Sequence, residues 1–158
     1  MRRTFAAELH KQMTLNTDIF LLVGDLGYKM FDQIREDYPS RVINCGASEQ
    51  AMMDMAVGLE HSGKIPFVYS ITPFLIYRCF ETLRTYINHE ILNIKLVGSG
   101  RDDDYKHDGY SHDATDARKI ISTLPNIGQL FPETKEEIPE VLENAIRFNG
   151  PLFISLKR

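Results

Sequence analysis

Short, nearly continuous apolar runs alternate along this chain with longer segments whose apolar residues recur at helical spacing. The first run, Ile19–Val23, is followed by Gly24, and such runs are typical of strands covered on both faces in a parallel sheet. Similar runs predict strands at 41–44, 65–70, 94–97, 126–131 and 152–156. Because these strands alternate with helical segments, the sequence predicts an α/β fold. We expect a three-layer α/β/α sandwich with a mostly parallel six-stranded sheet.

Helical spacing marks the segments that connect the predicted strands. Phe5, Leu9 and Met13 recur at i, i+4 and i+8, which indicates an amphipathic first helix. Further helices are expected at 28–36, at 48–63, from 73 to about 91, and at about 113–122. The apolar face of the last helix consists of Ile138, Val141, Leu142, Ala145 and Phe148. The spacing of Thr134 and Glu137 fits a capping box, but Pro139 leaves the start of this helix open.

Two of the predicted helices start directly after strands. Ser48 is expected to cap the helix at 48–63, and Gly63 is expected to end it. The apolar face predicted for this helix consists of Ala51, Met52, Met55, Ala56 and Leu59. Pro73 suits the first turn of the long helix, because the missing N–H is not needed there. The apolar stripe predicted for the long helix consists of Ile76, Phe80, Leu83, Ile87 and Ile91.

The composition is that of a soluble globular domain, which we expect to span residues 1–158: 43% of the residues are apolar and 25% are charged. The formal net charge of −4 does not suit a protein that binds nucleic acid through a basic face. Cys45 and Cys79 lack C-x-x-C spacing, so neither a disulfide framework nor a zinc site is indicated. No apolar run approaches the roughly 20 residues of a membrane helix. The charged N-terminus lacks a signal peptide, and we expect a cytoplasmic protein.

Glycine and polar residues cluster where the predicted strands end. These positions are 24–25, 46–49, 70–74 and 98–112. The carboxyl ends of parallel strands meet at one edge of a sheet, and ligands bind in the crevice outside that edge. The sequence therefore predicts a functional site assembled from these four segments.

Glu49 and two aromatic residues are the first candidates at this edge. Glu49 opens a helix, where an acid can simply complement the helix dipole. Alternatively, its carboxylate projects into the crevice and exchanges a proton with a ligand nitrogen. Phe74 and Tyr77 are three residues apart at a helix start, so they share a face. That face either joins the core or forms a platform on which a ligand stacks.

The segment 101–113 is rich in aspartate and histidine. The spacing of its histidines fits no common zinc pattern, so a solvated loop is the simpler interpretation and we expect no metal ligand in this chain. His112 follows an Asp-Gly turn and could instead donate to a substrate or move a proton. The segment 24–27, GDLG, lacks the spacing of the common phosphate-binding turns.

Several segments, taken together and in order, resemble the pyrimidine-binding domain of transketolase and its thiamine-diphosphate-dependent relatives. The similarity extends along nearly the whole chain. It begins with RTFAAEL at 3–9 and VGDL at 23–26, and it is sharpest at NCGASEQAM at 44–52, followed by AVGL at 56–59 and Gly63. It continues through FLIYRCFETLR at 74–84 and ends with DGYSH at 108–112 and LPN at 124–126. The resemblance implies the thiamine-diphosphate-binding fold.

The resemblance also implies roles at a cofactor site. Glu49 matches the family's glutamate that hydrogen-bonds N1′ of the aminopyrimidine of thiamine diphosphate, and it is the first expected catalytic residue. Tyr77 matches the aromatic residue that stacks on this ring, and its hydroxyl needs a partner. Phe74 is expected to line the same pocket, and Asp25 corresponds to an acid close to the cofactor.

Two further residues match the family's contacts with the donor substrate. Asp108 and His112 are expected to bind the sugar, and His112 is the second expected catalytic residue. The segment before Asp108 departs from the family's usual glycine-rich loop. This departure leaves the substrate preference open.

The resemblance implies a second polypeptide. The family's diphosphate-binding domain carries a GDG…N metal motif, and GDLG at 24–27 is not that motif. We therefore expect a diphosphate-binding partner subunit that anchors most of the thiamine diphosphate and Mg²⁺, in an α2β2 heterotetramer. The implied activity is transfer of a two-carbon ketol unit between sugars.

Three alternatives remain at this point. The first is acyl transfer from pyruvate, as in relatives that resemble deoxyxylulose-phosphate synthase or dehydrogenase β-subunits. The second is a non-catalytic interaction domain that kept the fold, although such a domain has no need for Glu49. The third is an unrelated flavodoxin-like binding domain.

Overall fold

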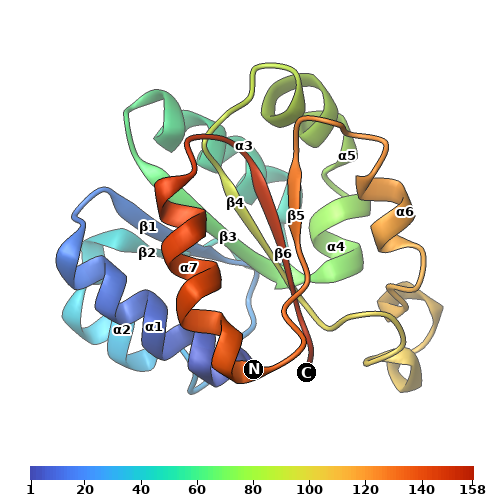
Figure 1. The fold of residues 1–158 in the computed structure, drawn as a ribbon, viewed down its shortest axis with the longest axis horizontal. Coiled ribbons are helices and arrows are strands. Elements are labelled where there is room, and N and C mark those ends of the chain that lie inside the picture. The colour runs from blue at the N-terminus through green and yellow to red at the C-terminus, as the bar shows by residue number, and fades with distance from the viewer.

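The computed structural model describes residues 1–158, which form one six-stranded sheet flanked by helices (Figure 1). The strands are β1 (Ile19–Val23), β2 (Val42–Asn44), β3 (Ile65–Ile71), β4 (Lys95–Ser99), β5 (Gly128–Leu130) and β6 (Leu152–Leu156). Their order is β2-β1-β3-β4-β6-β5, and every neighbouring pair is parallel. The predicted α/β class and all six strands are confirmed, and the sheet is wholly parallel.

Helices cover both faces of the sheet (Figure 1). One face packs against α1 (Arg2–Leu15), α2 (Asp32–Asp37) and α7 (Ile138–Arg147). The other packs against α3 (Glu49–His61), α4 (Thr72–Tyr77), α5 (Phe80–Thr82) and α6 (Ala117–Ile121). In β1, the Leu21 side chain packs on the face covered by α1, α2 and α7, and the Leu22 side chain packs on the other face. Because successive side chains point to opposite faces, a strand buried on both faces is continuously apolar.

The α3 helix buries a different face from the one predicted. Its buried residues are Glu49, Met52, Met53 and Ala56, whose positions i, i+3, i+4 and i+7 follow one helical stripe. Ala51 and Met55 are exposed, so the predicted apolar face is wrong at these two positions. The side chain of Ser48 makes no capping hydrogen bond, although Ser48 occupies the N-cap position. The stripe that faces the sheet therefore includes a carboxylate.

The long helix predicted from Pro73 is interrupted. Pro73 does lie in the first turn of α4, but α4 ends at Tyr77 and a π-helical segment, Leu83–Asn88, follows α5. The break occurs at Cys79, whose backbone leaves helical geometry at φ −108° and ψ 13°. The buried Cys79 thiol donates to the Phe74 carbonyl at 3.8 Å. Ile91, the last residue of the predicted stripe, is 53% exposed.

Other helix boundaries differ by a few residues. The helix expected at 28–36 begins only at Asp32, and the one expected at about 113–122 covers Ala117–Ile121. The capping box of Thr134 and Glu137 is confirmed, and it caps a 3₁₀ turn at Lys135–Glu137. The α7 helix follows this turn directly and accommodates Pro139 in its first turn. None of the helices combines the length and hydropathy needed to cross a bilayer.

Candidate active site

The Glu49 carboxylate lies inside the carboxyl edge of the sheet. It is the first residue of α3, and its side chain is 2% exposed. Ser70, near the end of β3, donates a hydrogen bond from its hydroxyl to Oε1 at 3.3 Å. A Cβ atom on Gly24, directly after β1, would lie 3.1 Å from the Ser70 hydroxyl and 3.5 Å from Oε1. The glycine therefore permits the close approach of β1, β3 and α3 that encloses the carboxylate.

Arg78 connects Glu49 to an aromatic ring and to His112. Its Nη1 donates to Glu49 Oε2 at 2.7 Å, and its guanidinium carbon lies 3.7 Å from the centre of the Phe74 ring. Phe74 in turn contacts His112 edge to face, with ring centres 4.8 Å apart. Glu49, Phe74 and His112 come from three distant parts of the chain and share one continuous contact path.

Arg78 is the member of this contact path that the sequence analysis did not single out. The available signal was its spacing, because Arg78 follows Phe74 by four residues and such pairs meet on one helix face. The guanidinium is about half exposed, whereas the carboxylate beneath it is buried. Arg78 therefore covers Glu49 on the side that faces solvent and neutralises its charge.

Tyr77 contacts the 101–113 segment and α6. Its hydroxyl donates a hydrogen bond to Asp116, which supplies the partner that the hydroxyl needs. Partial burial and the Asp116 carboxylate raise the pKa of Tyr77 well above its usual range. Tyr77 is 39% exposed and borders a pocket of about 250 Å³. The other lining residues are Tyr110, Ser111, Asp113, Asp116 and Ile120.

Asp25 lies at the same edge of the sheet, in a separate hollow. Its backbone adopts a left-handed conformation, with φ 52°. The Asn44 amide donates to the Asp25 carboxylate at 3.3 Å and accepts from the backbone N–H groups of Asp25 and Gly46. This arrangement joins the ends of β1 and β2 and forms one wall of a pocket lined also by Tyr28 and Arg35. Asp25 is connected to the Glu49 carboxylate only through the preceding residue, Gly24, which lies next to that carboxylate.

Asp108 does not contact the other predicted site residues. It ends an exposed 3₁₀ turn, Lys106–Asp108, where its carboxylate lies 3.4 Å from His107 Nε2. Gly109 then turns the chain with φ 94°, and a second 3₁₀ turn places His112 against Phe74. We call Glu49, Arg78, Phe74 and His112, which contact one another in this order, the Glu49 cluster. Of the two residues expected to bind the substrate, His112 belongs to this cluster and Asp108 lies outside it.

Neither cysteine is arranged as a nucleophile. Burial and the nearby Glu49 carboxylate raise the pKa of Cys79 to about 12, and burial also raises the pKa of Cys45. A thiol that stays protonated is a weak nucleophile and a weak metal ligand. The candidate groups for chemistry at this site are therefore the carboxylate, the arginine and the histidine rather than a thiol.

A double-mutant cycle on Glu49 and Arg78 tests their pairing. The Arg78→Met variant leaves a buried carboxylate without its cation, so we expect it to lose about 1–3 kcal/mol of unfolding free energy. The same change made in a Glu49→Gln background should cost less, because no buried charge remains. Urea denaturation of the four proteins measures the difference. Equal losses in both backgrounds would contradict the pairing.

The geometry defines a class of protein. A wholly parallel α/β domain carries a buried glutamate at the carboxyl edge of its sheet, beside an aromatic ring and a histidine. Residues 1–158 match the family described as transketolase, pyrimidine binding domain. The chain therefore belongs to this family, as its resemblance predicted.

Named relatives agree with this assignment. The putative transketolase C-terminal section of Methanocaldococcus jannaschii is 27% identical over 159 residues, which cover 100% of this chain and 50% of that protein. An apulose-4-phosphate transketolase subunit of Actinobacillus succinogenes is 28% identical over 121 residues, which cover 77% of this chain and 39% of that protein. The chain thus spans half or less of the length of these relatives.

The fold also matches solved structures. One, described as a split gene transketolase in an inactive beta4 tetramer, superimposes with a TM-score of 0.87 at 29% identity. The match covers 99% of this chain and 51% of that chain. The predicted thiamine-diphosphate-binding fold is confirmed.

Proposed function

We propose that this chain is the pyrimidine-binding part of a split, thiamine-diphosphate-dependent transketolase that transfers a two-carbon ketol unit between sugars. The observation that carries the proposal is the Glu49 carboxylate, enclosed at the sheet edge beside Phe74 and His112. The similarity to an apulose-4-phosphate transketolase subunit and to a split gene transketolase supports it.

The residues at this edge fit the aminopyrimidine end of the cofactor. Gly24 leaves the space beside Glu49 that a Cβ would fill, and the Glu49 carboxyl group can share a proton with a ring nitrogen, which accepts a hydrogen bond through its lone pair. In the proposed complex Glu49 holds N1′ and shares its proton, while Phe74 and Tyr77 line the ring and Asp25 lies close to it. Bound thiamine diphosphate supplies the electron sink for breaking and forming carbon–carbon bonds beside a carbonyl.

Other residues of this chain act on the carboxylate and the substrate. Ser70 and Arg78 fix both oxygens of Glu49, so the carboxylate does not have to reorient when a proton is shared. His112 donates to an oxygen of the donor sugar, and Asp108 binds a hydroxyl farther along it. The contact between His112 and Phe74 keeps the imidazole near Glu49.

We place the diphosphate group and Mg²⁺ of the cofactor on a partner subunit, in an α2β2 heterotetramer. The relative from Actinobacillus succinogenes is itself one subunit of a transketolase, which supports an enzyme made of more than one polypeptide. We also place the complex in the cytoplasm, a reducing compartment in which the two free cysteines of this chain persist.

The partner requirement has a direct test. The isolated chain should show no measurable heat of binding with thiamine diphosphate and Mg²⁺, because one protein subunit holds only one end of the cofactor. Mixed with its diphosphate-binding subunit, it should bind the cofactor and transfer a ketol unit from a ketose phosphate to an aldose. Calorimetry and a coupled aldehyde assay measure both effects. Tight binding of the cofactor by the chain alone would contradict the proposal.

The same assay distinguishes ketol transfer between sugars from acyl transfer from pyruvate, the alternative enzyme activity. Complexes that consume pyruvate but no ketose phosphate would favour acyl transfer. We expect sugar chemistry, because the donor-binding motif that ends in His112 is present and its imidazole lies at the Glu49 cluster.

A further inference from the structure

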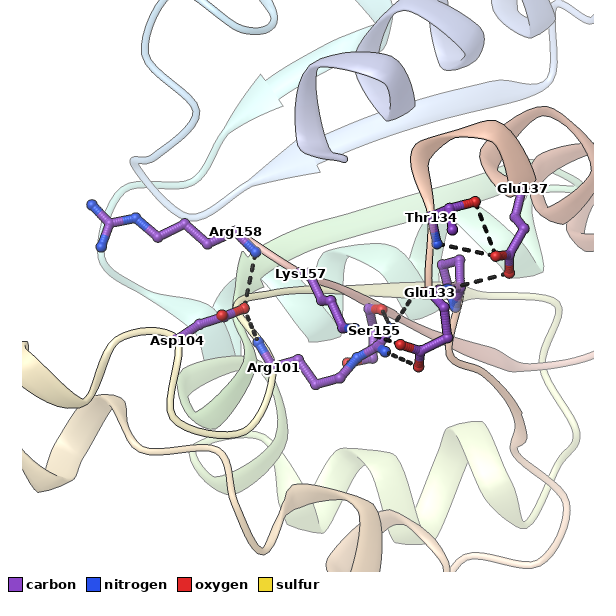
Figure 2. Close-up of polar contacts among 9 residues, drawn as sticks. Arg101, Asp104, Glu133, Thr134, Glu137, Ser155, Lys157 and Arg158 are labelled. Atoms are coloured by element: carbon purple, nitrogen blue, oxygen red, sulfur yellow. Dashed lines mark hydrogen bonds and ion pairs between the residues drawn. The ribbon is translucent and has the colours of Figure 1, made fainter.

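A buried arginine lies at the base of the segment that carries Asp108 and His112. Arg101 is 5% exposed, and its guanidinium bonds to three residues from the neighbouring strand β6 and from the segment that follows β5. It donates to Glu133 Oε1 at 2.7 Å, to the Pro132 carbonyl at 2.8 Å, and to the carbonyl and hydroxyl of Ser155. Figure 2 shows Arg101 extended between Glu133 and Ser155. A planar guanidinium with this many partners has one well-defined position.

The backbone of the same segment is closed just beyond Arg101. The Ala114 N–H donates to the Asp102 carbonyl at 2.8 Å, and these two residues form an antiparallel bridge. Asp104 Oδ2 accepts from the backbone N–H groups of Arg101 and Arg158, each at 2.9 Å (Figure 2). The segment 102–113 is therefore a closed loop whose base is fixed by Arg101 and Asp104.

Inside this loop, Tyr105 is held by hydrogen bonds of its hydroxyl with Arg2 and Ser99, and few other side chains are held by packing. Every residue from 102 to 113 is exposed or half-buried. The loop consists of two short 3₁₀ turns joined at Gly109. A loop with so little apolar burial depends on its base and on a few polar contacts for its position. His112 is two residues from Ala114, on the side of the bridge opposite Arg101.

We propose that Arg101 is a positioning residue that fixes loop 102–113 and thereby holds His112 against Phe74. The connection between Arg101 and His112 is short. Arg101 fixes the adjacent Asp102, Asp102 pairs with Ala114, and His112 precedes Ala114 by two residues. Arg101 touches no site residue itself, so it acts through the backbone. The consequence for catalysis rests on the proposed function, in which His112 contacts the donor sugar.

An NMR signature of His112 tests the positioning directly, without a partner or substrate. The Phe74 ring, 4.8 Å from the His112 ring, shifts the imidazole proton resonances by its ring current. Arg101→Met should move these resonances toward the values of an unstructured peptide, and His112→Gln identifies them among the five histidines. Amide hydrogen exchange in 102–113 should accelerate by about tenfold or more, while α1 and α3 keep their protection.

Matched variants keep the test decisive. Arg118→Met is the control, because Arg118 is exposed and stacks on the same Phe131 ring that Arg101 approaches. It should leave the His112 resonances unchanged. Arg101→Lys keeps the charge but loses the fork of donors, so it should restore the resonances only in part. Asp104→Asn weakens the hydrogen bonds at the same base of the loop and removes no buried side chain. It should also shift the His112 resonances.

In the reconstituted complex, Arg101→Met should raise KM for the donor on the order of tenfold and change kcat less. Unchanged His112 resonances and unchanged loop exchange in Arg101→Met would overturn the positioning role. Uniformly faster exchange across α1, α3 and the loop would also overturn it, because Arg101 would then support the whole fold. An inactive wild-type complex would instead overturn the proposed function, since the resonances of His112 are measured without turnover.

Discussion

Glu49→Gln should reduce kcat of the reconstituted complex by about 10²–10⁴-fold, the range found when a positioned general acid or base is removed. Glutamine has nearly the same shape, but only one of its two terminal atoms is an oxygen, so it can accept from Arg78 or from Ser70 and not from both. It cannot take up or share the proton of a ring nitrogen. Steady-state rates with saturating ketose phosphate and aldose measure the loss, and circular dichroism checks that the variant is folded.

Glu81→Gln is the matched control for this substitution. Glu81 also lies in the first turn of a helix, α5, but its side chain is exposed and it makes no contact with the Glu49 cluster. If a first-turn acid served only the helix dipole, the two variants would behave alike. An unchanged rate in Glu49→Gln would favour the non-catalytic interaction domain, which the sequence left open. A large loss confined to Glu49→Gln would exclude it.

Burial of Glu49 also shows where sequence periodicity stops being informative. An apolar-only count along α3 selects Ala51 and Met55 for the core, and both are exposed. The helix instead buries the stripe that begins with Glu49, because Ser70 and Arg78 satisfy the carboxylate. A pattern of hydrophobicity cannot detect a polar residue whose partners lie 21 and 29 residues away.

The strands, in contrast, could be predicted from their apolar content. Ile19–Val23 and Leu152–Leu156 are buried on both faces, so apolar content alone identifies them, and their observed bounds match the predicted ones. Helix ends were less predictable, since they depend on tertiary contacts. At the break the buried Cys79 thiol contacts a carbonyl of the preceding turn, and no local propensity encodes that contact.

The location of the candidate site at the sheet edge could be predicted, whereas most of its side-chain contacts could not. Parallel topology brings the ends of β1, β2 and β3 to one edge, so Gly24, Glu49 and Ser70 meet as expected. The sequence could not show that Tyr77 pairs with Asp116, or that Asp108 lies apart from His112. The second of these outcomes depends on the course of loop 102–113, which Arg101 fixes through residues more than 30 positions away.

A second large effect is expected at the opposite edge of the sheet, where Lys95 begins β4. Lys95 has no exposed surface, and its ammonium donates to the carbonyls of Phe148 and Gly150, each at 2.7 Å. Both partners are neutral backbone groups beyond the end of α7, so no carboxylate compensates the buried charge. Burial lowers the pKa of Lys95 from 10.5 to about 7.

The stability of the protein should therefore rise with pH above about 7. Between about pH 7 and pH 10.5, the unfolded chain keeps the Lys95 proton and the folded chain releases it. Unfolding in this window takes up one proton, so lowering the proton concentration disfavours the unfolded state and increases the unfolding free energy by up to about 1.4 kcal/mol per pH unit. Below about pH 7 both states are protonated, and this contribution no longer changes.

Comparison with Lys95→Met isolates this contribution. Methionine fills a similar volume and does not titrate, so the unfolding free energy of the variant should lack the rise of the wild type between about pH 7 and pH 9. Other titrating groups, including Cys79, act equally in both proteins and cancel in the difference. Lys119→Met, at an exposed position of α6, should retain the wild-type slope. Parallel curves for wild type and Lys95→Met in urea denaturation would show that Lys95 keeps its proton when buried. Because Lys95 lies at the amino edge, the substitution should leave the kcat of the complex unchanged.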